Sequence, residues 1–149
     1  MQLSKNFYLS ELIFSETAER FSLNNDPGAE EIAELKNLCV NVLQPLRDAL
    51  GVPVIINSGY RGPAVNKRIG GSVNSQHMKG QAADIRVVGM NAQSVCEKII
   101  ELDLPFDQLI FEGTWTHVSH NSRGNRKQVL TAHFAPGMRT RYTPGLPAR

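Results

Sequence analysis

The chain has 149 residues, of which 41% are hydrophobic and 20% are charged, a composition typical of one ordinary globular domain. The 16 Lys and Arg residues against 14 Asp and Glu give a formal charge of only +2. This balance argues against nucleic-acid binding, because such proteins usually carry a strong basic surplus. No apolar run approaches the roughly 20 residues of a membrane span, and the first residues do not resemble a secretory signal.

The first half of the chain is predicted to be helical. Short helical pieces are expected over residues 7–21, with Ser10 and Ser15 as N-caps. A longer helix is expected next, because apolar residues recur at helical spacing on one face from Ile32 to Leu50. Pro45 should kink this helix, and Gly51 should end it.

The second half predicts strands with one inserted helix. Strands are expected at residues 52–56, 83–88, 108–112, 115–119 and 128–133, and a helix capped by Asn91 at residues 91–102. Residues 57–80 lack periodicity, and a loop that long inside a compact domain is usually functional. The order of elements predicts an α+β fold with a small, mainly antiparallel sheet. We expect one domain over residues 1–134 and a tail over residues 135–149 that is loose or lies on the surface.

The two cysteines, Cys39 and Cys96, lie in apolar, helix-like surroundings. We therefore expect buried thiols rather than a disulfide. Because the chain has no C-x-x-C motif, a thiolate zinc site is excluded. A metal ion in this protein would need histidine and carboxylate ligands.

Two histidines and an aspartate from separate elements form a candidate metal site. His77 lies near the end of the polar loop, Asp84 lies at the start of the next strand, and His117 belongs to the last predicted hairpin. Such a set matches a catalytic zinc with three protein ligands and one water, whose pKa zinc lowers to about 7. Asp84 also has small apolar neighbours, where an unpaired carboxylate is unfavourable. The alternative is a solvated His77 and an Asp84 that only caps its strand.

Arg61 and Trp115 are candidates for the walls of a cleft. Arg61 closely follows a predicted strand, where its guanidinium can bind a carboxylate through two hydrogen bonds. The alternative is an ordinary surface arginine. Strand alternation places Trp115 on the same face as His117, where it either lines a cleft or packs in the core.

Three segments resemble peptidase family M15, the zinc D-Ala-D-Ala carboxypeptidases. The family signature S-x-H-x-x-G-x-A-x-D is matched by Ser75-Gln-His77-Met-Lys-Gly80-Gln-Ala82-Ala-Asp84. The second histidine segment is similar to Trp115-Thr-His117-Val-Ser119, and the stretch S-G-Y-R-x-P-x-x-N to Ser58-Gly-Tyr60-Arg61-Gly-Pro63 with Asn66. Residues 6–12 and 43–47 resemble a subgroup found in many phage genomes. The resemblance spans about residues 7–130 and leaves the tail unmatched.

The resemblance implies a peptidoglycan peptidase with the hedgehog/DD-peptidase fold and one Zn²⁺ ion bound by His77, Asp84 and His117. It implies that Arg61 contacts the substrate or polarises the scissile carbonyl. Ser75 would support the ligands or face the substrate, and we also assign Tyr60 and Trp115 to substrate binding. The substrate would be the peptidoglycan stem peptide, cut at D-Ala-D-Ala by a carboxypeptidase or at L-Ala-D-Glu by an endopeptidase.

The resemblance does not identify the general base. Many relatives carry an acidic residue three positions before the second zinc histidine, where this chain has Thr114; others carry a histidine two positions before it, where this chain has Trp115. Glu112 is our first candidate, because it ends the preceding strand and the hairpin can fold it toward the metal. Asp107 and His120 are weaker candidates.

Two other functions stay open from the sequence alone. One is a non-catalytic, metal-stabilised module that binds the cell wall or belongs to a virion. The other is a nucleic-acid protein that uses its basic residues Arg123, Arg126, Lys127, Arg139, Arg141 and Arg149, although aromatic residues between them are scarce. We favour a phage-derived cell-wall lysis enzyme, expected to be a monomer. It would be made in the cytoplasm, without membrane insertion, and would act on the wall after release into the host periplasm or as a virion component.

Overall fold

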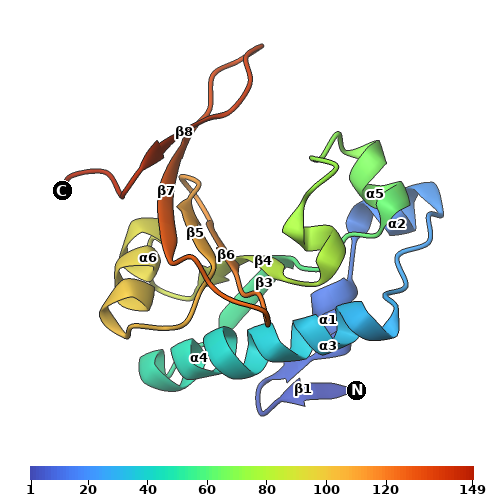
Figure 1. Cartoon of the computed structure of the whole chain (residues 1–149), viewed down its shortest axis with the longest axis horizontal. Helices are drawn as coiled ribbons and strands as arrows, with labels where there is room; N and C mark the ends of the chain where they lie inside the picture. The colour runs from blue at the N-terminus through green and yellow to red at the C-terminus, as the bar shows by residue number, and fades with distance from the viewer.

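A six-stranded sheet forms the centre of the computed structural model, which describes all residues, 1–149 (Figure 1). Its strand order is β3-β4-β6-β5-β7-β8. The bounds are β3 Val54–Ser58, β4 Ala82–Val87, β5 Gln108–Phe111, β6 Thr116–Ser119, β7 Gln128–His133 and β8 Arg141–Pro144. Every pair is antiparallel except β5 and β7, which run parallel. The predicted α+β class with a mainly antiparallel sheet is confirmed.

Two short strands that the sequence analysis did not predict open the chain. They are β1 (Gln2–Ser4) and β2 (Phe7–Tyr8), which pair antiparallel before α1 (Leu9–Ile13) and α2 (Glu16–Phe21). Ser15 caps α2 as predicted, because its hydroxyl accepts a hydrogen bond from the Ala18 N–H at 3.1 Å. The prediction for Ser10 is wrong. The preceding residue Leu9 is already helical, and the N-cap position belongs to Tyr8.

The longest helical segment consists of α3 (Ala29–Leu38), the π-helical turn η1 (Cys39–Leu43) and α4 (Gln44–Leu50). Its inner face is fully buried, at Leu35, Leu38, Cys39, Val42, Leu43 and Leu46. Pro45 has no N–H to donate to the preceding turn. The disturbance predicted at Pro45 takes the form of this wider turn, in which the Gln44 N–H donates to the Cys39 carbonyl. Gly51 ends the segment in the left-handed conformation, with φ of 68°.

Residues 57–80 are not one irregular loop. They contain α5 (Pro63–Arg68) and a 3-10 turn, η2 (Gln76–Lys79). Pro63 opens α5 at a position where its missing N–H has no intrahelical partner to lose. Both elements are too short to show a helical period in the sequence, and for this reason the pattern analysis missed them.

The two faces of the sheet have different roles. Helix α6 (Ala92–Glu101), capped by Asn91 as predicted, contacts β4, β5 and β6. Side chains such as Ile85 and Val118 on these strands belong to the hydrophobic core. Because strand side chains alternate, Asp84 and His117 project from the opposite face. This face is free to carry a polar site.

Both thiols lie in the core, as expected. Cys39 and Cys96 are buried and unbonded to each other. Burial raises the pKa of Cys39 to about 12 and that of Cys96 to about 11, so both thiols stay protonated at neutral pH. No helix is both long and apolar enough to span a bilayer.

Of the two alternatives expected for the tail, a loose segment or one lying on the surface, Arg141–Pro144 follow the second. These residues form β8, which pairs antiparallel with β7 at the edge of the sheet. Beyond it, the Gly145 N–H donates to the Val129 carbonyl at 2.9 Å, and Arg149 binds the Glu97 carboxylate of α6 at 2.6 Å. The four-residue strand ends at Pro144 and is followed by Gly145, and its pairing partner cannot be read from local sequence.

Candidate metal centre and active-site cleft

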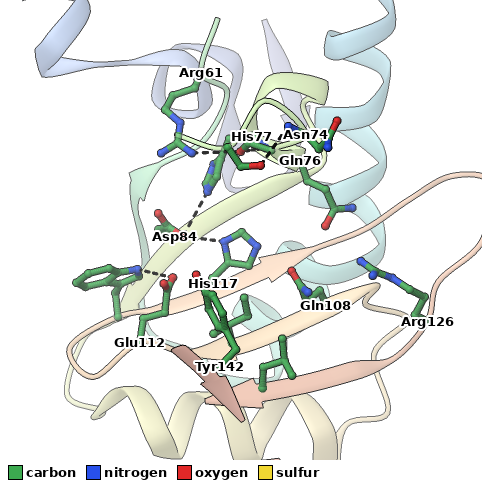
Figure 2. Close-up of a pocket in the computed structure, with 15 residues that line it drawn as sticks. Arg61, Asn74, Gln76, His77, Asp84, Gln108, Glu112, His117, Arg126 and Tyr142 are labelled. Carbon is green, nitrogen blue, oxygen red and sulfur yellow. Dashed lines mark hydrogen bonds and ion pairs between the residues drawn. The ribbon is translucent and has the colours of Figure 1, made fainter. Parts of the chain in front are cut away.

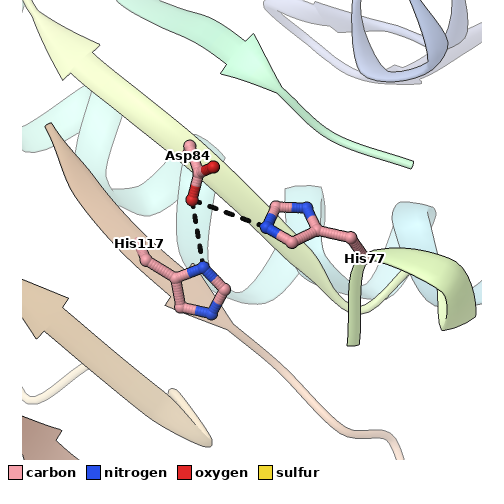
Figure 3. Close-up of side chains that lie close together, drawn as sticks. All are labelled: His77, Asp84 and His117. Carbon is pink, nitrogen blue, oxygen red and sulfur yellow. Dashed lines mark hydrogen bonds and ion pairs between the residues drawn. The ribbon is translucent and has the colours of Figure 1, made fainter. Parts of the chain in front are cut away.

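His77, Asp84 and His117 converge on one point, as predicted (Figure 3). One ligand atom from each lies within 4.8 Å of the other two. Asp84 Oδ1 is 3.5 Å from His77 Nε2 and 3.0 Å from His117 Nδ1. The neighbouring strands explain the close pair, since Asp84 of β4 lies directly opposite His117 of β6. His77 comes from η2, on a separate part of the chain.

A backbone hydrogen bond fixes the orientation of His77. Its Nδ1 lies 2.7 Å from the Gly59 carbonyl oxygen, which can only accept, so Nδ1 carries the proton and donates. In the neutral imidazole the lone pair then lies on the other nitrogen, Nε2, which faces Asp84 at 3.5 Å. Metal-binding histidines use this second-nitrogen contact to set tautomer and ring orientation.

Two glycines allow the segments around His77 to pack closely. A side chain on Gly59 would place its Cβ 2.3 Å from the Leu12 carbonyl oxygen of α1. Gly80 ends η2 with φ of 72°, and a Cβ there would lie 2.4 Å from the Glu31 carbonyl oxygen of α3. Helix α1 therefore packs against Gly59, whose carbonyl binds His77, and α3 packs against Gly80, which ends the turn that carries His77. Only glycine fits at both contacts.

The ionisation of Asp84 depends on its two histidine neighbours. Burial opposes the charged form, but the adjacent His117 and His77 side chains outweigh it and hold the pKa of Asp84 well below its usual range. The carboxylate is thus negative in a largely enclosed setting, with 17% of its side chain exposed. A divalent cation placed between the three side chains would satisfy the carboxylate and both imidazole lone pairs.

The metal centre opens onto a cleft of about 550 Å³ (Figure 2). The other residues lining the cleft are Arg61, Ser72, Asn74, Ser75, Gln76, Gln108, Ile110, Glu112, Trp115, Arg126, Leu130 and Tyr142. Three of the side chains on the cleft floor, Gln108, Ile110 and Glu112, come from alternating positions along and just after β5. Ile110 lies opposite His117, so the metal centre sits near the middle of this row.

Arg61 and Ser75 line the cleft, as the resemblance implied. The Arg61 Nη2 donates to Ser75 Oγ at 3.2 Å, and the same hydroxyl accepts from the His77 N–H at 3.2 Å. Ser75 thus connects the arginine to the segment that carries a metal ligand. The buried Nε of Arg61 has no hydrogen-bond partner within the chain.

Glu112 faces the cleft near Asp84 and is held by Trp115. The Trp115 indole N–H donates to Glu112 Oε2 at 2.9 Å. Burial, reinforced by the negative Asp84, raises the pKa of Glu112, against the opposing effects of His117, the Trp115 hydrogen bond and Arg61. A carboxyl beside a metal centre can accept a proton and release it again, and a raised pKa makes it a stronger proton acceptor when it is ionised.

The structure removes three predicted candidates from the cleft. Asp107 is buried beneath it and engaged by Arg126 and Gln76, so it has no free access to a substrate. His120 is 6% exposed and absent from the lining. Tyr60, assigned to substrate binding, is 4% exposed and packs within the hydrophobic core. Of the three proposed bases, only Glu112 reaches the cleft.

Eight lining residues were missed as site residues by sequence reasoning: Ser72, Asn74, Gln76, Gln108, Ile110, Arg126, Leu130 and Tyr142. Gln108 alternates with Ile110 on β5, a signal that strand periodicity does contain. Arg126, Leu130 and Tyr142 come from the segment before β7, from β7 itself and from β8. Nothing in their local sequence predicts that they line the cleft, because this depends on how β7 and β8 pair with the rest of the sheet.

The donor set and the cleft define the class of protein. Two imidazole nitrogens and one carboxylate oxygen, open to solvent on one side, fit a single zinc ion of the catalytic type rather than a closed structural site. The fold and this centre are those expected of a metal-dependent hydrolase.

The comparison with protein families agrees with this class. The model of the family Peptidase M15 matches residues 5–119, and the chain belongs to this family. A zinc D-Ala-D-Ala carboxypeptidase from Streptomyces albus G is 42% identical over 55 residues. This alignment covers 36% of the chain and 20% of that protein, so the chain spans only about a fifth of the relative's length.

Proposed function

We propose that this protein is a zinc-dependent peptidase that hydrolyses peptide bonds in the stem peptides of peptidoglycan. The observation that carries the proposal is the open His77–Asp84–His117 centre, with Glu112 and Arg61 beside it in one cleft. Membership of the M15 family and the partial likeness to a zinc D-Ala-D-Ala carboxypeptidase support the substrate class.

The side chains around the centre have separate roles in hydrolysis. Bound zinc would supply a water of lowered pKa and polarise the scissile carbonyl. Glu112 takes the proton from the attacking water and passes it to the leaving amine. Arg61, which lines the cleft, donates to the oxygen on which negative charge develops or to a substrate carboxylate. Trp115 keeps Glu112 aimed at the reacting atoms.

Both candidate bonds suit this arrangement. A D-Ala-D-Ala carboxypeptidase releases one residue, whereas an L-Ala-D-Glu endopeptidase separates the stem from its first residue. We further propose that the enzyme acts on the wall during phage lysis, after release from the cell that makes it or as a virion component.

The test is digestion of purified peptidoglycan, followed by mass spectrometry of the products. We expect fragments from one of the two bonds, complete loss of cleavage with a chelator and recovery with Zn²⁺. His77→Ala should abolish cleavage, whereas His133→Ala is the control, since His133 lies on β7 outside the cleft lining and contacts Thr143. Intact His77→Ala activity would place the chemistry elsewhere.

If the protein is instead a non-catalytic module, the same peptidoglycan assay should give a different result. Such a module would bind wall fragments and zinc with the same ligands but release no new termini. Such binding without turnover, in a zinc-loaded and folded sample, would refute the peptidase and favour the module.

A further inference from the structure

We infer that Arg126 is a specificity-determining residue that binds a carboxylate of the stem peptide at the end of the cleft opposite Glu112. The inference rests on the proposed function and adds a recognition site to it. Arg126 lies beyond residues 5–119, the part matched by the family model.

The floor of the cleft gives Arg126 its position relative to the metal centre. Gln108 begins β5 and Glu112 follows the end of it, a separation of about 13 Å at the usual rise of a strand. Asp107, which binds Arg126, directly precedes Gln108. Because Ile110 lies opposite His117, the metal centre is midway along this row. Figure 2 shows Arg126 and Glu112 on opposite sides of His117.

This length matches a short extended peptide. About 13 Å corresponds to roughly four residues of extended chain. With its scissile bond at the centre, a substrate would place groups one or two residues away within reach of the long Arg126 side chain. Stem peptides carry free carboxylates at such positions, at the C-terminus and on D-Glu.

A buried carboxylate holds Arg126 in place. Asp107, with 4% of its side chain exposed, accepts hydrogen bonds from Arg126 Nε at 3.0 Å and from Nη2 at 2.9 Å. It also accepts from the Arg126 backbone N–H at 2.8 Å and from Gln76 Nε2 at 3.0 Å. Gln76 directly precedes His77. The segment that carries this metal ligand therefore also helps to hold Asp107 and, through it, Arg126.

The hydrogen bonds to Asp107 leave one edge of the guanidinium free. They use Nε and Nη2 on one side, while the remaining N–H groups, including both on Nη1, make no hydrogen bond to the chain. The Arg126 side chain is 58% exposed, although its partner is almost completely buried. A guanidinium presents five N–H donors, and its free edge can bind a second carboxylate through two hydrogen bonds. Because Asp107 already fixes the side chain, little further conformational entropy is lost on binding.

Three synthetic stem pentapeptides test the inference. The first carries free carboxylates on D-Glu and at the D-Ala-D-Ala terminus, the second has an amidated C-terminus, and the third has an amidated D-Glu carboxyl. We expect the wild-type protein to cleave the free peptide with a kcat/KM about 10- to 150-fold above that of one amide, as for a charge-assisted hydrogen bond. The amide that is cleaved poorly identifies which carboxylate Arg126 binds.

Arg126→Gln should abolish this preference. The kcat/KM for the free peptide should fall to that of the discriminated amide, whose own value stays near its wild-type level. Arg123→Gln is the matched control, because it removes the same charge from the same segment at an exposed residue outside the cleft lining. It should leave the preference intact.

A double variant tests whether a lost preference only reflects misfolding. Arg126→Gln leaves Asp107 buried without its charged partner, which is destabilising, whereas Asp107→Asn with Arg126→Gln restores a neutral pair and should also lack the preference. The inference is overturned if the wild type shows no carboxylate preference, if either variant retains it, or if free and amidated peptides lose activity equally. Absence of any cleavage by the zinc-loaded wild type overturns the proposed function itself.

Discussion

Replacing Trp115 with phenylalanine should move the acidic limb of the pH–activity profile to higher pH. The indole N–H donates to Glu112 Oε2 at 2.9 Å and favours the ionised carboxylate. Phenylalanine keeps an aromatic ring but has no donor, so the pKa of Glu112 rises beyond the increase that burial already causes. A base works only when deprotonated. Activity is therefore lost as pH falls through this pKa, and a higher pKa moves the loss to higher pH.

The size of the effect follows from this one contact. A hydrogen bond to a charged group contributes about 1.5–3 kcal/mol, and about 1.36 kcal/mol corresponds to one pH unit in a titration. The limb should thus move by about one to two pH units, and by less where water takes the place of the indole N–H. At high pH, where Glu112 is ionised in both proteins, the rates should converge.

The assay is kcat/KM for a synthetic stem peptide across the pH range, at constant ionic strength and saturating zinc. Phe134→Leu is the control. The Phe134 ring packs beside Trp115, with 6.1 Å between the ring centroids, but it has no group that can hydrogen-bond to Glu112. This variant should leave the limb in place. An unchanged or acid-shifted limb in Trp115→Phe would mean that another group titrates, and Glu112 would lose its assignment.

Three further predictions concern the base, the metal and the support of His77. Glu112→Gln should lower kcat by about 10²- to 10⁴-fold while zinc content, measured by atomic absorption, stays at one ion per chain. Zinc at about 100 times its dissociation constant should add about 2.7 kcal/mol of stability and raise the Tm by roughly 5–11 °C for a chain of this length, as calorimetry with and without a chelator can show; an unaltered Tm would speak against a bound ion. Gly80→Ala should reduce the free energy of unfolding in urea by more than the roughly 1–2 kcal/mol of a left-handed residue, because its Cβ also meets the Glu31 carbonyl at 2.4 Å. Gly51→Ala, with a similar φ and nothing within 4 Å, should lose only the conformational part, and equal losses would refute the packing argument.

The metal ligands could be predicted from sequence because the residues that carry the family resemblance lie in short local segments. His77 and Asp84 belong to one ten-residue signature, and His117 lies on a hairpin whose short turn fixes its register. The helices with clear apolar periods and the caps at Ser15 and Asn91 were likewise predictable, since these signals depend on neighbouring residues.

The walls of the cleft were decided by contacts between distant segments. From the sequence, Asp107 was a candidate base. In the structure it is buried, and it accepts hydrogen bonds from Arg126 and Gln76, which lie 19 and 31 positions away. Tyr60 stands next to Arg61 in the stretch S-G-Y-R-x-P-x-x-N, but the two side chains separate, one into the core and the other into the cleft.

By itself, the sequence determined the chemistry of this protein: which three side chains can hold zinc, and which strands and helices carry them. Only the tertiary structure decided what surrounds that ion, because the parallel pairing of β5 with β7 and the addition of β8 bring Arg126, Leu130 and Tyr142 to the cleft. Strand pairing depends on which backbone edges and side-chain faces meet across the whole domain. That is a property of the assembled sheet, and no short stretch of residues encodes it.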